Sequence, residues 1–139
     1  MTSFSQGEIE YLGSQPLARL ATVSLDGQPD VAPVGFEFDG TYFYVGGLNL
    51  SATRKFRNIG SGNQKVAFVV DDLVSTNPWT PRGLRIYGIA ELIERTGRLG
   101  AGQYVRITPT ISWSWNLEGR APGSGTDFRP RRTVHSAPR

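Results

Sequence analysis

Two Asp-Gly pairs, Asp26-Gly27 and Asp39-Gly40, each separate two short runs of strand-forming residues. Asp-Gly is typical of the two-residue turn of a β-hairpin, because such turns need residues that tolerate a positive φ angle. The pairs therefore constrain this part of the chain to a local antiparallel meander and the molecule to a mainly β fold. The expected strands cover residues 17–24, 31–38 and 41–45.

The rest of the chain predicts three further strands and one or two short helices. The expected strands are residues 65–70, 84–94 and 104–117, and the expected helices are residues 5–14 and about 52–59. Residues 73–83 and 95–102 are expected to be loops, and Pro109 is expected to interrupt the last strand. Six antiparallel strands favour a small closed or split β-barrel, because closure removes exposed strand edges.

Composition favours one domain over residues 1–118, followed by an Arg/Pro/Gly-rich C-terminal tail over residues 119–139. The tail holds five Arg and one Asp, so the net charge of +3 belongs to the tail and not to the body. Such a composition predicts a loosely held extension. The tail does not favour a nucleic-acid partner, because it has one aromatic residue and no recognised motif. His135, also in the tail, is a poor candidate for a general base.

Several classes of function are disfavoured by what the sequence lacks. The chain has no cysteine and no apolar run near the ~20 residues that a membrane span needs. Its first residues lack the basic and apolar regions of a signal peptide. We therefore expect a cytoplasmic protein without a membrane partner. No catalytic triad, metal motif or paired-carboxylate signature is present, so the residues predict no metal.

Residues 46–58 form the clearest candidate binding segment, since they read as a strand end, a tight turn and a helix start. Ser51 is the expected N-cap. The donors that follow it are Thr53, Arg54, Lys55 and Arg57. A helix N-terminus attracts anions and disfavours cations, so cations at this position indicate a bound anion such as a phosphate. The alternative interpretation is a solvated helix face.

The order of these blocks resembles a known family. The blocks are the strand with Pro33-Val-Gly-Phe36, the segment Asn49-Leu-Ser-Ala-Thr-Arg-Lys-Phe-Arg-Asn58, and Val66-Ala-Phe-Val-Val-Asp-Asp72. Together they are similar to the pyridoxamine-phosphate-oxidase-like split β-barrel superfamily. Residues 71–91, with Asn77-Pro-Trp-Thr-Pro-Arg-Gly83, resemble its coenzyme F420-dependent branch, and within it the subgroup that includes the terminal reductase of oxytetracycline biosynthesis. The match departs at Ser112–Trp115 and at residues 95–102, which look shortened.

The resemblance implies a homodimer with cofactor sites between subunits and hydride transfer to or from an unsaturated small molecule. The implied cofactor is the deazaflavin coenzyme F420, whose anionic tail would meet the cations of residues 53–57. FMN is the alternative cofactor, and a non-catalytic cofactor carrier is the alternative function. The implied cofactor-binding residues are Pro33, Val34, Gly35, Asn49, Ser51, Thr53, Arg54, Lys55, Arg57, Trp79 and Arg82.

The resemblance also divides these residues by role. Residues 33–35 would border the ring of the cofactor, and Trp79 and Arg82 would cover it from the other subunit. Trp113 and Trp115 are expected in the core or the dimer interface. Independently of the resemblance, four tyrosines are expected to be mostly strand packing residues. Donation of the substrate proton by one of them is the alternative, and the sequence does not say which, so the catalytic residues stay unknown. The candidates are Tyr42, Tyr44, Tyr87 and Tyr104.

Overall fold

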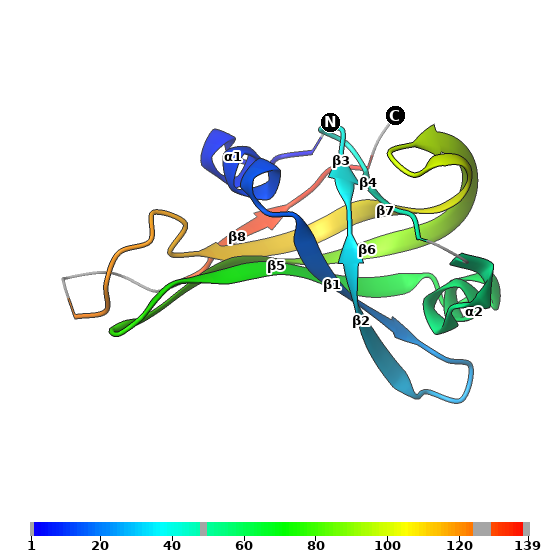
Figure 1. Cartoon of the computed structure of the whole chain (residues 1–139), viewed down its shortest axis with the longest axis horizontal. Coiled ribbons are helices and arrows are strands. Elements are labelled where there is room, and N and C mark those ends of the chain that lie inside the picture. Colours follow the sequence, from blue (N-terminus) through cyan, green and yellow to red (C-terminus); the bar gives the residue numbers. More distant parts are fainter. Residues whose placement is uncertain (1, 48–49, 124–128, 138–139) are drawn as a thin grey trace.

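The computed structural model describes residues 2–47, 50–123 and 129–137 (Figure 1). Within these residues it contains eight strands, two α-helices and one 3-10 turn. In chain order they are α1 (Gln6–Ser14), β1 (Leu17–Val23), β2 (Pro29–Gly35), β3 (Glu37–Phe38), β4 (Phe43–Val45), η1 (Leu50–Ala52), α2 (Arg54–Gly60), β5 (Lys65–Thr76), β6 (Trp79–Gly97), β7 (Gly100–Trp115) and β8 (Arg131–Val134). The mainly β class and the short helices are confirmed, whereas the expected number of six strands is wrong.

All strands pair antiparallel in one sheet with the order β2-β1-β5-β6-β7-β4-β3, and β8 pairs with β7. The sheet is not closed, because β2 and β3 stand at its two ends and do not pair among the described residues. The chain itself passes from one end to the other at Phe36, between β2 and β3. The sheet therefore curls toward a barrel but stays open between β2 and β3.

The predicted second strand, residues 31–38, divides at Phe36 into β2 and β3. The Asp-Gly turns are present, with positive φ angles at Gly27 and Gly40 of 89° and 96°. They close two separate hairpins, β1–β2 and β3–β4, that lie at opposite ends of the sheet order. The predicted three-stranded meander is therefore wrong, because local turn signals do not specify which edge of a sheet the next hairpin joins.

The two segments predicted to be loops, residues 73–83 and 95–102, are mostly strand in the structure. β5 and β6 continue to a two-residue turn at Asn77-Pro78, and β6 and β7 continue to a turn at Arg98-Leu99. Pro and Gly in these segments are tolerated because the long strands pair with each other almost to their ends. The predicted interruption near Pro109 is a register shift, where Tyr87 pairs with Ile111 and the next residue of β6 pairs with Pro109.

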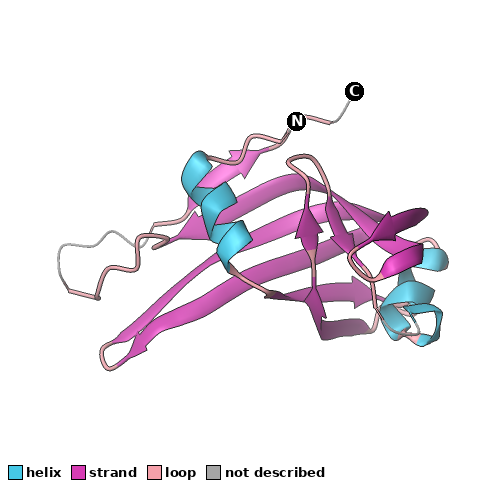
Figure 2. Ribbon diagram, turned by 45° about the horizontal axis from the view of Figure 1, so that its top comes forward, coloured by secondary structure: helices cyan, strands magenta, loops and turns pink. Residues whose placement is uncertain are grey.

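The core lies between the curled sheet and the segments that cover it. Phe43, Phe68 and Leu84 are among the fully buried side chains, each worth about 1.5–3 kcal/mol of burial. The helices lie toward opposite ends of the sheet (Figure 2). α1 confirms the helix expected over residues 5–14, and the structure adds that Ser5 is its N-cap and forms a capping box with Glu8. No described helix has the length and apolar character that crossing a membrane requires.

The tail contributes a strand, which differs from the predicted loose extension. β8 pairs with β7 from Ile111 to Ser114. Arg131 forms an ion pair of 2.6 Å with the buried carboxylate of Glu8. His135 is buried and its ring packs on Phe4, with 4.3 Å between the ring centroids. These contacts join the two ends of the described chain.

Candidate functional site

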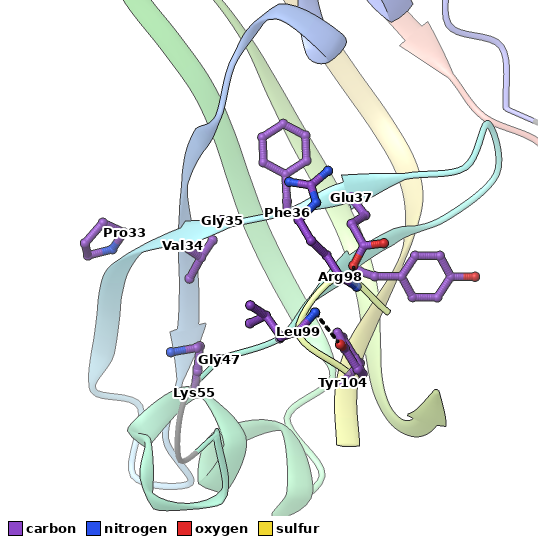
Figure 3. Close-up of a pocket in the computed structure, with 12 residues that line it drawn as sticks. Pro33, Val34, Gly35, Phe36, Glu37, Gly47, Lys55, Arg98, Leu99 and Tyr104 are labelled. Carbon is purple, nitrogen blue, oxygen red and sulfur yellow. Dashed lines mark hydrogen bonds between the residues drawn. The ribbon is translucent and has the colours of Figure 1, made fainter. Parts of the chain in front are cut away.

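A cavity of about 260 Å³ lies between the edge strand β2, the end of β4, helix α2 and the β6–β7 turn (Figure 3). Of the residues implied at the cofactor, Pro33, Val34, Gly35 and Lys55 line it. The cavity therefore brings together the β2 and α2 parts of the site, which are separated by about twenty positions in the sequence.

The wall of the cavity that β2 forms is an edge strand of the sheet. Among the described strands β2 pairs only with β1, so its outer side presents backbone groups that no strand occupies. Val34 is buried and anchors the strand, while Pro33 and Gly35 on either side are exposed. This arrangement can hydrogen-bond the polar edge of a flat ligand.

Helix α2 begins two residues later than predicted. A 3-10 turn covers Ser51, and Thr53 is the N-cap, with its Oγ1 accepting from the Phe56 amide at 3.3 Å. The same hydroxyl donates to the Leu50 carbonyl at 2.6 Å. The predicted N-cap Ser51 is therefore wrong, and the Thr53 side chain serves the helix start. Asn49 lies outside the described residues.

The cations of α2 point in different directions, as a rotation of about 100° per residue requires. Lys55 is half-buried and lines the cavity. Arg54 and Arg57 are exposed and do not line it. The Arg54 charge adds to the hydrogen bonds of Ser24 and the Gln28 amide in lowering the pKa of Asp26, on the β1–β2 turn.

The β6–β7 turn forms a wall of the cavity that was not predicted from the sequence. Arg98 and Leu99 line the cavity from this turn. The Arg98 amide donates to a Glu37 carboxylate oxygen at 3.0 Å and lowers the pKa of Glu37 together with the Arg95 guanidinium. Tyr104 Oη accepts from the Leu99 amide at 3.1 Å. No local motif marks these residues, because Glu37 and the turn meet only through the sheet order.

The tyrosines that line the cavity have engaged hydroxyls. Tyr44 Oη donates to Asp39 at 2.9 Å, and burial together with this bond raises the pKa of Tyr44. Tyr104 Oη donates to the Gly100 carbonyl at 2.8 Å. The other two candidates, Tyr42 and Tyr87, do not line this cavity. These bonds agree with the expectation that the tyrosines are mainly packing residues, and proton donation by one of them stays a prediction.

Trp79 and Arg82 lie away from the cavity within one chain. Trp79 is 62% exposed at the tip of the β5–β6 hairpin, which extends in the direction opposite to α2 (Figure 1). Arg82 binds both carboxylate oxygens of Asp72 at 2.8 and 3.2 Å and lies over the Tyr11 ring. Burial opposes ionisation of Asp72, but the bonds from Arg82 and Tyr11 hold its pKa below the usual range.

A second cavity of about 240 Å³ adjoins the first and contains Ser51. Gly47, Leu99 and Tyr104 line both cavities. The two spaces therefore form one groove that extends from Lys55 at the start of α2, past the β6–β7 turn, to Ser51 in the 3-10 turn η1.

The open antiparallel sheet with its short helices is shared with a known protein family. Residues 7–122 match the pyridoxamine 5'-phosphate oxidase family, and the chain belongs to that family. It is 40% identical over 123 residues to 5a,11a-dehydrotetracycline/5a,11a-dehydrooxytetracycline reductase of Streptomyces rimosus subsp. rimosus, covering 84% of this chain and 85% of that protein. The family resemblance seen in the sequence is thereby confirmed.

Solved structures share the fold. An F420 reductase is 26% identical, with a TM-score of 0.58, and the match covers 74% of this chain and 94% of that one. An FAD-binding protein of Mesorhizobium loti is 18% identical, with a TM-score of 0.63, and the match covers 81% and 92% of the two chains. The F420 reductase, together with the dehydrotetracycline reductase, supports an oxidoreductase of this fold, whereas the FAD-binding protein shares the fold alone.

Proposed function

We propose that this chain is an oxidoreductase that binds coenzyme F420 and transfers a hydride to or from an unsaturated small molecule. The observation that carries the proposal is the groove, which combines an edge strand with two cations, Lys55 and Arg98. Neither cation forms an ion pair with another residue that the structure describes. The bound deazaflavin supplies the hydride-carrying ring, while the protein supplies orientation and electrostatics.

The size of the groove supports a ring in the cavity and a tail outside it. At about 260 Å³ the cavity lies just below the ~300–1,000 Å³ of typical ligand sites. In the proposed arrangement the ring lies against residues 33–35 of β2, whose outer backbone groups hydrogen-bond its polar edge. Lys55 then meets the phosphate, since charge-assisted contacts are about twice as strong as neutral ones.

The exposed cations of α2 would serve the distal part of the same tail. Arg54 and Arg57 lie outside the cavity but on the helix that forms its wall. Ser51 faces the adjoining space, where a tail that leaves the cavity along α2 would pass. The assignment of Ser51, Thr53, Arg54 and Arg57 to cofactor binding stays a prediction.

A homodimer is part of the proposal because an apolar row crosses one exposed face of the sheet. Directly paired residues share a face, and one such row crosses six strands. The row consists of Val31, Ala21, Ala67, Tyr87, Ile111 and Val134. Val31, Tyr87 and Val134 are 65%, 44% and 60% exposed, and a groove of about 560 Å³ lies along the row. Contiguous exposed apolar surface of this kind is typical of an interface.

In such a dimer the β5–β6 hairpin would reach the partner's groove. Trp79 at its tip is a large apolar side chain without cover in one chain, and we propose that it closes the ring site of the partner. Arg82 has a partner of its own in Asp72, so its assignment to the cofactor stays a prediction.

FMN is the second candidate cofactor. The FAD-binding relative shows that this fold accommodates a flavin in another protein, and an FMN phosphate would use the same Lys55. A flavin absorbance spectrum in the protein as purified would favour FMN over F420. A carrier without turnover would bind the cofactor tightly and leave it reduced in the presence of every acceptor.

The test of the activity is oxidation of reduced F420 by the purified protein with unsaturated carbonyl compounds, 5a,11a-dehydrotetracycline among them. The proposal expects acceptor-dependent oxidation of F420 and a product that has gained two hydrogens. Binding of F420 with no oxidation by any acceptor would favour the carrier, and oxidation of reduced FMN alone would favour the flavin enzyme.

A further inference from the structure

The end of the β6–β7 hairpin projects beyond the rest of the sheet at the cavity. Strand β7 pairs with β4 only from Val105 to Ile107, so residues 100–104 pair with β6 alone among the described strands. A hairpin of two strands is only marginally stable without further contacts. The position of the turn at Arg98-Leu99, and with it one wall of the cavity, therefore depends on side chains that hold it.

Glu37 of β3 holds this turn by its first residue. Its carboxylate accepts from the Arg98 amide at 3.0 Å and from the Arg95 guanidinium at 3.2 Å. The bond from the Arg98 amide is the main cause that lowers the pKa of Glu37, so the carboxylate is ionised at neutral pH. The Arg95 guanidinium is held in turn over the Tyr44 ring, at 3.8 Å from the ring centroid. Glu37 is thus an acceptor in a fixed place.

The next residues of the turn are bound by Tyr104. Its Oη accepts from the Leu99 amide at 3.1 Å, a bond that Figure 3 shows, and donates to the Gly100 carbonyl at 2.8 Å. A Cβ atom on Gly97 would lie 2.9 Å from a carboxylate oxygen of Glu37. Glycine at this position therefore lets the carboxylate reach the turn.

The segment that carries Glu37 also forms the opposite wall of the cavity. Residues 33–35 line the cavity from β2, and Glu37 follows two positions later and lines it as well. β2 and β3 do not pair with each other among the described strands, so strand pairing does not fix the distance between the two walls. Glu37 links them, because its backbone continues from one wall and its carboxylate binds the other.

We infer that Glu37 is a positioning residue for cofactor binding, and that it sets the width of the cavity by holding Arg98 and the β6–β7 turn opposite residues 33–35. This inference rests on the proposed function, in which the cavity holds the deazaflavin. A wall that is already in place loses less conformational entropy when the ligand binds, so a preformed cavity binds more tightly.

The charge of Glu37 makes this inference testable by the sign of an effect. The carboxylate is negative, and so is the proposed cofactor. Loss of the charge alone would therefore tighten F420 binding, whereas loss of the bond to the Arg98 amide would weaken it. Glu37→Ala removes both the charge and the acceptor. Glu37→Gln also removes the charge but keeps an oxygen that the amide can reach.

The first measurement is a titration of the purified protein with F420. Glu37→Ala should raise the F420 dissociation constant about fivefold, since a turn that must be ordered on binding costs affinity. Glu37→Gln should restore most of the lost affinity. Rescue by the glutamine would assign the effect to the hydrogen bond and not to the charge.

Glu91→Ala is the matched control for the loss of an ion pair. Glu91 binds Arg106 at 2.7 Å, and the Arg106 guanidinium lies over the Tyr42 ring at 4.6 Å, as Arg95 lies over a tyrosine. Glu91 lines neither cavity of the groove. Because a partly exposed ion pair contributes little, its removal should leave the F420 dissociation constant within about twofold of the wild type.

Amide hydrogen exchange of the protein without cofactor is the second measurement. Glu37→Ala should accelerate exchange at Arg98. Tyr104→Phe keeps the ring, removes the bond to Leu99, and should accelerate exchange there and weaken F420 binding. Exchange at a buried core amide such as that of Phe68 should stay as in the wild type, since the change is confined to the turn.

Three results would overturn the inference. They are F420 binding by Glu37→Ala that is as tight as or tighter than that of the wild type, equal weakening by Glu37→Ala and Glu37→Gln, and unchanged exchange at Arg98 in Glu37→Ala. Failure of the proposed function is a separate result, because the wild-type protein would then bind neither F420 nor FMN before any variant is compared.

Discussion

Lys55 is the residue on which the cofactor proposal depends most. It is the α2 cation that lines the cavity, whereas Arg54 and Arg57 are exposed on the same helix. Loss of one charge-assisted contact corresponds to about tenfold in affinity. Lys55→Ala should therefore raise the F420 dissociation constant about tenfold, and Arg54→Ala should raise it less.

The matched control for this charge is Lys65→Ala. Lys65 is an exposed lysine at the start of β5 that lines the groove of the outer sheet face and not the cavity, so light scattering must first show that the variant keeps the wild-type oligomeric state. Its removal should leave the F420 dissociation constant unchanged in the same titration. Equal effects of Lys55→Ala and Lys65→Ala would mean that the net charge of the protein, and not a specific contact, attracts the cofactor.

His135 should make stability depend on pH. Its Nδ1 accepts from the Ser3 amide at 3.0 Å, so Nε2 carries the proton and donates to Ser112 Oγ at 2.8 Å. Burial lowers the pKa of His135, partly opposed by the Glu8 charge and reinforced by Arg131. The unfolded state then binds more protons near pH 6, so the free energy of unfolding should fall as the pH drops below about 6.5.

Urea unfolding at pH 8 and pH 5 measures this dependence, with His135→Gln as the comparison. The variant lacks the titrating ring, so its free energy of unfolding should change less between the two pH values. The contribution of His135 to the free energy of unfolding is fully present above the unfolded-state pKa of about 6.5, and it is lost as the pH falls from there toward the lowered pKa. Identical pH profiles for the two proteins would contradict a neutral buried His135.

At the scale of elements, the connection after β4 depends on close packing at Gly46. A Cβ there would lie 2.6 Å from the Tyr104 ring, whereas a Cβ on the neighbouring Gly47 would meet nothing within 4 Å among the residues that the structure describes. Gly46→Ala should lower the free energy of unfolding by about 1–3 kcal/mol, and Gly47→Ala should change it by less than about 0.5 kcal/mol. Urea unfolding of both variants measures the difference, and equal destabilisation would refute the packing argument.

The elements also show what could be predicted from the sequence. Helix α1 with its Ser5 cap and the turns at Gly27 and Gly40 were predictable, because each depends on residues close in the chain. The separation of β2 from β3 at Phe36 and the pairing of β8 with β7 were not, because both depend on which edges meet in space.

The walls of the candidate site also differ in whether they could be predicted from the sequence. The β2 wall and Lys55 follow from recognisable local blocks of sequence, and both line the cavity. The opposite wall follows from long-range bonds of Glu37 and Tyr104 to the β6–β7 turn, which no periodicity indicates. The N-cap moved from Ser51 to Thr53 because a 3-10 turn precedes the helix, and the residue types fit both positions.

At the scale of the whole molecule, the apolar row across the outer sheet face predicts a dimer. Two chains of 15.2 kDa should run as one particle in light scattering. Tyr87→Glu places a charge in the middle of the row and should shift the protein toward monomer. Leu25→Glu, on an exposed turn outside the row, should not. A wild-type monomer at micromolar concentration would contradict the proposed interface.

The central claim is that this groove binds a deazaflavin. Its most direct test is a spectroscopic titration of the wild-type protein with oxidised and reduced F420, and with FMN in parallel. The account predicts saturable F420 binding at micromolar concentration or tighter, with weaker binding of FMN. A folded protein that binds no F420 at these concentrations, or that binds FMN more tightly, would contradict the claim.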